Sequence, residues 1–108
     1  MTEDTRPWVD QYRDAAEEWA DKESAAQLLE DMKSAVMAQK QAMLGGDIPV
    51  NRAEQTVKAS RDWERYVQSC VDARKEANLA KVKVEFIRMR FAEEQSRAAS
   101  ARAEMRLV

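Results

Sequence analysis

Few residues in this chain have the types and spacing that catalysis, metal binding or phosphate binding requires. The sequence has a single cysteine and no histidine, which excludes Ser–His and Cys–His nucleophile pairs as well as zinc and haem sites. The 2 glycines form no phosphate-binding loop. We therefore expect a protein that is not an enzyme and that carries no cofactor and no metal.

The one thiol, Cys70, stands close to Val67 and Val71. It cannot form an internal disulfide. Free cysteines are commonly buried as small hydrophobic residues, and this is the interpretation we adopt. The alternative is a reactive or cross-linking thiol.

Charge is distributed unevenly along the chain. The 18 Lys+Arg and 20 Asp+Glu residues give a net charge of −2, and 35% of all residues are charged. Residues 1–31 carry a net charge of −7, whereas residues 51–108 carry +4. Two binding chemistries follow as alternatives. The C-terminal arginines Arg97, Arg102 and Arg106 are candidates for nucleic-acid contact, and the N-terminal acidic face is a candidate mimic of nucleic acid that inhibits a host protein.

The elements that must position these groups are helices. Only 2 glycines and 2 prolines occur in 108 residues, too few for the turns of a barrel or sandwich. The one cluster of helix breakers, residues 45–50, divides two stretches of helix-forming residues. We predict one all-α domain over residues 1–108, with a helix at about 5–44, a turn at 45–50 and a helix at about 51–105. Asn51, three residues before Glu54, is the predicted N-cap of the second helix.

The first helix has two alternative forms. Ser24 and Gln27 repeat the capping pattern after a polar run, which indicates a break at residues 22–24. The same polar run also fits an unbroken helix.

A heptad repeat is the strongest periodic pattern in the second helix. Thirteen of fourteen positions are apolar or aromatic, with Glu94 as the exception, and we call this set the seam. The seam consists of Trp63, Tyr66, Cys70, Ala73, Ala77, Ala80, Val84, Ile87, Phe91, Glu94, Ala98, Ala101, Met105 and Val108.

A second apolar row lies on the same helix, and we call it the outer stripe. The alternation over residues 81–86 alone would fit a strand, but it lacks flanking turns, so we assign it to the helix. An apolar row outside the seam indicates that this part of the helix is covered from two sides. The outer stripe consists of Leu79, Val82, Phe86 and Met89.

Basic residues border the seam, and the acidic first stretch complements them. A hairpin turning near residue 47 would place residue i opposite about 95 − i, so that residues 4–22 meet residues 73–91. We therefore predict an antiparallel hairpin. The basic residues are Arg74, Lys81, Lys83, Arg88, Arg90, Arg97 and Arg102, against the acid Glu76. The residues predicted to face the seam are Trp8, Tyr12, Trp19, Leu28, Leu29, Met32 and Val36.

The C-terminal segment, residues 92–108, has no opposite helix in this register. It keeps apolar residues, including Met105 and Leu107, and either binds a partner or frays as a solvated tail. A two-helix hairpin also leaves the outer stripe exposed to solvent, so we predict a homo-oligomer or a protein partner. The predicted interface residues are Leu79, Val82, Phe86, Met89, Met105 and Leu107.

The second half of the chain resembles a known group of proteins. The motifs are Asn51-Arg52-Ala53-Glu54, the aromatic-bearing run at 61–66, and Val84-Glu85-Phe86-Ile87-Arg88. Over roughly residues 24–97 they resemble small helical-hairpin proteins of tailed phages and prophages, encoded near single-strand annealing recombinases. The resemblance implies a genomic setting in DNA recombination or replication and no particular activity.

These observations lead to one expected function. We expect a helical assembly or adaptor protein, with an unknown protein partner favoured over nucleic acid and with no membrane partner. The start of the chain lacks the features of a signal peptide, so we expect a cytoplasmic location, in the host cell if the protein is phage-encoded.

Overall fold

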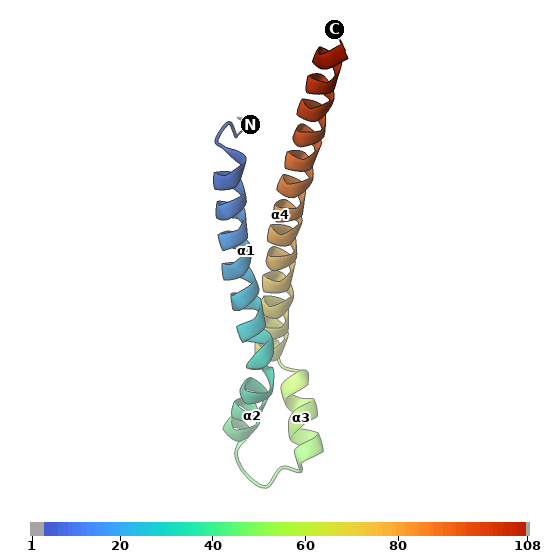
Figure 1. Ribbon diagram of the computed structural model, residues 1–108. Helices are drawn as coiled ribbons and strands as arrows, with labels where there is room; N and C mark the ends of the chain where they lie inside the picture. Colours follow the sequence, from blue (N-terminus) through green and yellow to red (C-terminus); the bar gives the residue numbers. More distant parts are fainter. Residues whose placement is uncertain (1–3, 108) are drawn as a thin grey trace. The chain divides into compact units, whose positions relative to one another are not determined.

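The computed structural model describes residues 4–107, and every regular element within them is an α-helix. The order of the helices is α1 (Trp8–Asp31), α2 (Lys33–Leu44), α3 (Val50–Lys58) and α4 (Arg61–Leu107) (Figure 1). The predicted all-α helical hairpin is confirmed. Residues 81–86 lie within α4, so their strand-like alternation does not form a strand.

The chain forms two compact units. The first unit combines Met1–Asp21 with Asn78–Val108, and the second is Lys22–Ala77. In the first unit, the beginning of α1 packs against the second half of α4, with Ala15, Val84 and Ile87 as the buried cluster. In the second unit, α2 packs against α3. There the Tyr66 hydroxyl of α4 also donates a hydrogen bond to the Leu29 carbonyl of α1.

The seam is confirmed up to Ile87 and is uncovered beyond it. Phe91 is 43% exposed, and the seam positions after it are exposed as far as Met105. Val108 lies outside the described residues. The half-buried position of Cys70 supports its interpretation as a packing residue. The buried and half-buried seam residues are Trp63, Tyr66, Cys70, Ala73, Ala77, Ala80, Val84 and Ile87.

Two alanines, rather than large residues, are the most buried part of α1. Ala15 is 2% exposed and Ala26 is 0% exposed. Together with the half-buried Trp8, Trp19 and Leu29 they lie on one face of α1, at spacings of three, four or seven residues. Small side chains let two helix backbones approach closely, so these alanines set the distance between α1 and α4 within each unit.

Part of the predicted facing row is wrong. Leu28 is 60% exposed, Met32 is 45% exposed and Tyr12 is 39% exposed. Leu28 directly precedes Leu29, and neighbouring residues point about 100° apart on a helix, so only Leu29 reaches the contact face. Val36 is half-buried in α2.

The predicted N-cap of the second helix is also wrong. Pro49 precedes α3 with φ −55° and ψ 142°, and its carbonyl accepts the Ala53 amide hydrogen at 2.9 Å. Because proline already fixes φ near the helical value, the helix begins at Val50 and Asn51 lies inside it. In the preceding turn Gly45 and Gly46 have φ of 64° and 74°, values that side-chain-bearing residues rarely adopt.

Both predicted helices are interrupted, at places other than residues 22–24. The first stretch is unbroken there and breaks at Met32. The second stretch breaks at Ala59 and Ser60. At the second break the Ser60 hydroxyl accepts the Trp63 amide hydrogen at 3.2 Å, which makes Ser60 the N-cap of α4.

Ion pairs connect α1 and α4 within each unit, as the charge pattern predicts. In the second unit Arg74 binds both oxygens of Glu30, at 2.8 and 2.9 Å, and Glu23 at 2.6 Å. In the first unit the Lys83 ammonium lies 3.3 Å from Glu18. The predicted register places residue 77, not residue 83, opposite Glu18. Side chains on a helix lean toward its N-terminus, which carries those of α1 toward the C-terminal end of α4.

Candidate interaction surface

The outer stripe is an exposed apolar row on the first-unit part of α4. It begins two residues after Ala77 and follows the three- and four-residue spacing of one helix face. The seam residues Val84 and Ile87 fall on the opposite face, since 3.6 residues make a turn. The exposed fractions are 59% for Leu79, 58% for Val82, 57% for Phe86 and 68% for Met89.

Charges of opposite sign border this stripe. Glu85 lies on one side of it, and Lys83 and Arg90 lie on the other, by the same helical spacing. Lys83 is partly occupied by Glu18. Among residues 4–107, neither Glu85 nor Arg90 forms an ion pair, so both are available to a partner.

An apolar groove lies where α1 begins. It has a volume of about 350 Å³ and is lined by Trp8, Val9, Tyr12, Ile87, Arg88 and Phe91. The Arg88 guanidinium lies 5.9 Å from the centre of the Tyr12 ring, a cation–π contact. Arg88 therefore contacts an aromatic ring of α1 in addition to bordering the seam.

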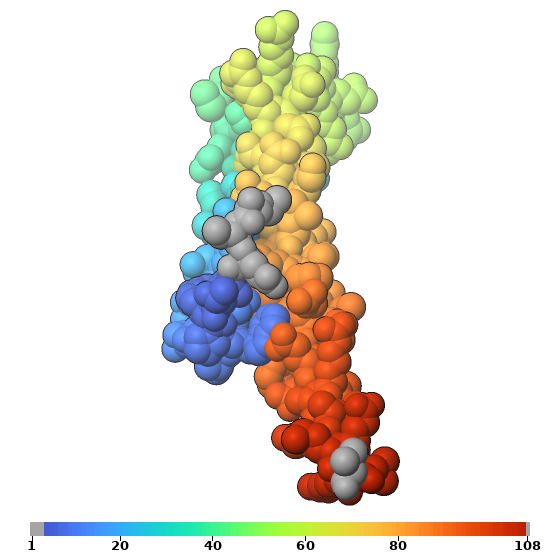
Figure 2. Space-filling model, turned by 90° about the horizontal axis from the view of Figure 1, so that it is seen from above, coloured from blue at the N-terminus to red at the C-terminus, as the bar shows by residue number. Residues whose placement is uncertain are grey.

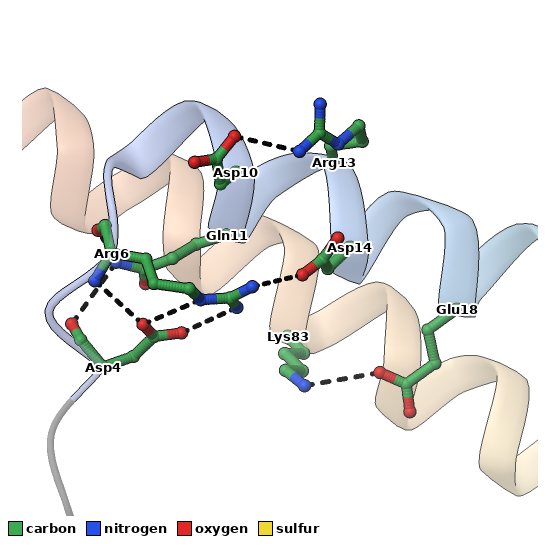
Figure 3. A network of polar contacts seen from close by, with 8 residues as sticks. All are labelled: Asp4, Arg6, Asp10, Gln11, Arg13, Asp14, Glu18 and Lys83. Atoms are coloured by element: carbon green, nitrogen blue, oxygen red, sulfur yellow. Dashed lines mark hydrogen bonds and ion pairs between the residues drawn. The ribbon is translucent and has the colours of Figure 1, made fainter.

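A polar network fixes the chain just before α1 (Figure 3). Arg6 binds the carboxylates of Asp4 and Asp14, while the Gln11 amide donates to the Arg6 carbonyl at 2.6 Å. Hydrogen bonds from Arg6 hold the pKa of Asp4 below its ordinary value. Asp4 and Asp14 are thus engaged in the local structure at the start of α1.

The C-terminal segment is helical as far as Leu107, rather than frayed. The indole N–H of Trp8 donates to the Glu94 carboxylate, and every residue from Gln95 to Leu107 is exposed. The space-filling view shows the red C-terminal turns extending past the blue start of α1 (Figure 2). Met105 is 77% exposed and Leu107 is 88% exposed.

The three C-terminal arginines are all exposed but do not share one environment. Arg97 forms an ion pair with Glu93 of its own helix at 2.6 Å. Within the part of the chain that the structure describes, Arg102 and Arg106 have no ion pair. Among the arginines that border the seam, only Arg74 forms ion pairs with acids of α1 within residues 4–107, since Arg88 contacts Tyr12 and Arg90 is unpaired.

The groove is the part of this surface that sequence analysis did not identify. Val9, which lines it, belongs to no apolar row of the sequence, and the sequence pattern predicts that Tyr12 lies on the packed face. The groove exists because α1 begins at Trp8 while α4 continues, and that geometry depends on the register between two distant segments. A row of apolar residues within one helix carries no such information.

Two other kinds of site are absent from the described range. No group of three or more His, Cys, Asp or Glu side chains in residues 4–107 is placed to hold a metal ion. None of the four described helices combines the length and the apolar character of a membrane span. In comparisons with known proteins, no family model, curated protein or solved structure matches this chain.

Proposed function

We propose that this protein is a non-catalytic helical assembly protein that associates with itself through the outer stripe. The observation that carries the proposal is the exposure of four large apolar side chains, each more than half exposed, in one row on one face of α4. Burying such a side chain fully is worth roughly 1.5–3 kcal/mol. Contiguous apolar rows of this kind are typical of interaction sites rather than of free surface.

A second copy of the chain fits this row by charge. In a parallel pairing, each outer stripe meets its own equivalent, and Glu85 of one copy faces Arg90 of the other on both sides of the contact. In an antiparallel pairing, Lys83 and Arg90 would face the same basic residues of the second copy. The charges bordering the outer stripe therefore favour the parallel arrangement.

The proposed setting comes from the resemblance to phage helical-hairpin proteins. It places the assembly among accessory proteins of a DNA recombination or replication region, in the host cytoplasm. In this role the protein organises other components and carries out no reaction itself. An adaptor use, in which a partner helix takes the place of the second copy, rests on the same outer stripe.

The test is the molar mass of the Phe86→Glu variant, measured by sedimentation equilibrium. A carboxylate at the centre of the outer stripe should lower the mass relative to the wild type, with an unchanged helical circular dichroism spectrum because Phe86 is 57% exposed. Met43→Glu is the matched control, since Met43 is 84% exposed and lies outside the outer stripe. An unchanged mass for Phe86→Glu would rule out self-association through this face.

A further inference from the structure

We infer that the C-terminal segment of α4 pairs in antiparallel orientation with the same segment of a second copy of the chain. This contact uses the seam face of α4, whereas the proposed function uses the opposite face. The starting observation is that the seam is buried only up to Ile87, and that the last contact of α1 with it is the hydrogen bond from Trp8 to the exposed Glu94. Beyond this point the seam pattern continues at Ala98, Ala101 and Met105, all exposed.

The antiparallel pairing would end at the groove at the start of α1. In the antiparallel register that matches Ala98 with Ala101 of the second copy, Met105 of one copy lies level with Glu94 of the other. Leu107 of the second copy then reaches the level of Ala92, at the mouth of the groove of about 350 Å³ lined by Trp8 and Phe91. The pairing covers Phe91, Met105 and Leu107, which are 43%, 77% and 88% exposed in the single chain.

Charge selects this register among those the seam allows. Arg97 and Glu104 occupy equivalent bordering positions of successive heptads. In an antiparallel pair each border of the seam faces the same border of the second copy. Arg97 of each copy therefore lies beside Glu104 of the other, which gives two equivalent contacts. Moving the register by one heptad in one direction places Arg97 against Arg97 once and Arg88 against Arg102 twice, which outnumber the two contacts it forms between Arg90 and Glu104. Moving it in the other direction places Glu104 against Glu104, so both neighbouring registers are disfavoured.

Charge also selects the orientation. In a parallel pair the two borders of the seam face each other, and Arg97 would meet Arg102 of the second copy on both sides. The antiparallel pair instead sets Arg102 against the neutral amide of Gln95. The existing ion pair between Arg97 and Glu93 is exposed, at 75% and 51%, and a pair of this kind is readily exchanged for one with Glu104 of the second copy.

A charge exchange tests the inference, and all variants carry Phe86→Glu so that the outer stripe does not contribute. We expect the Phe86→Glu protein to be a dimer. Adding Arg97→Glu or Glu104→Arg turns two attractive pairs into two repulsive ones and should raise the dimer dissociation constant about tenfold. Combining both changes restores opposite charges and should return the dissociation constant to within about threefold of the starting value.

Two controls separate the contact from effects on the helix itself. Glu93→Gln removes the partner that Arg97 has within its own helix and should leave the dimer intact. Arg61→Glu makes the same charge change outside the C-terminal segment and should also have no effect.

Three results would overturn the inference. One is a folded monomer for Phe86→Glu at micromolar concentration, and another is a double exchange that fails to restore the dimer. The third is a stronger dimer for Arg97→Glu, which is the result that parallel pairing requires. The lower molar mass expected for Phe86→Glu relative to the wild type tests the outer stripe alone. The charge exchange tests the C-terminal contact, so the proposed function and this inference can fail independently.

Discussion

The indole of Trp8, the first residue of α1, donates a hydrogen bond to the carboxylate of Glu94 in α4. This contact lies seven residues beyond Ile87, the last buried residue of α4. Val84 and Ile87 are buried before it, and all residues from Gln95 to Leu107 are exposed after it. The same helix therefore stabilises the hairpin in one part and offers a free face in the next.

We expect Trp8→Phe to lower the free energy of unfolding by about 1–2 kcal/mol, because it removes a hydrogen bond to a charged group while keeping an aromatic ring. Urea unfolding measures the change. In a double-mutant cycle with Glu94→Gln, the two changes should be less than additive if the hydrogen bond connects them. Fully additive effects would contradict the contact.

Replacing Ala26 with leucine should destabilise the second unit. Ala26 is 0% exposed, so a larger side chain must push α1 away from its neighbour, at a cost of typically 1–3 kcal/mol. Ala25→Leu is the matched control, since Ala25 is exposed on the same helix and should tolerate the change. Equal thermal unfolding midpoints for the two variants would show that Ala26 is not at a close contact.

Acid should weaken the hairpin through Glu30. The hydrogen bond from Arg74 holds the pKa of Glu30 below its ordinary value of 4.5. A lowered pKa stabilises the folded state above the ordinary value, and this contribution is lost as the pH falls below 4.5 through the pKa of the folded state. We expect the stability lost between neutral pH and pH 3 to be smaller in Glu30→Gln than in the wild type.

The exposed acid Glu17 provides the control for this measurement, because among residues 4–107 it forms no ion pair. Glu17→Gln should follow the wild-type dependence of the thermal unfolding midpoint on pH. If the thermal unfolding midpoint of Glu30→Gln depends on pH as that of the wild type does, the ion pair with Arg74 does not contribute to acid unfolding.

Salt separates the protein partner from the nucleic-acid alternative. Contacts of Arg97, Arg102 and Arg106 with about three phosphates would make binding fall steeply as salt rises, through counterion release. We expect no binding of single-stranded or duplex DNA at micromolar concentration in physiological salt, and only a shallow salt dependence of self-association. DNA binding under these conditions that Arg97→Glu with Arg102→Glu abolishes would favour the nucleic-acid function instead.

The packed half of the seam follows from the sequence because it depends on periodicity within one helix. The run from Trp63 to Ile87 repeats every three or four residues, and every one of those positions is buried or half-buried. The outer stripe follows for the same reason. Alanines such as Ala26 are harder to identify, since Ala is common on every face of this chain and its burial depends on which face meets another helix.

Helix breaks are less predictable because the local pattern does not decide them. Ser24 and Ser60 are both followed by residues suited to a helix start, yet only Ser60 caps a helix. The chain at Ser24 continues as helix in α1, where Glu23 binds Arg74. Packing against another segment selects between the two outcomes, and that information lies outside any short window of sequence.

The most direct test of the assembly proposed here is the molar mass, by sedimentation equilibrium at micromolar concentration, of the wild type, Phe86→Glu, Arg97→Glu and the variant with both changes. Two self-complementary contacts on opposite faces of α4 predict an assembly larger than a dimer for the wild type. Each single variant should reduce it toward a dimer, and the double variant should have the lowest mass of the four, with a dimer dissociation constant about tenfold above that of Phe86→Glu. A wild type that is a folded monomer throughout this concentration range would contradict the account.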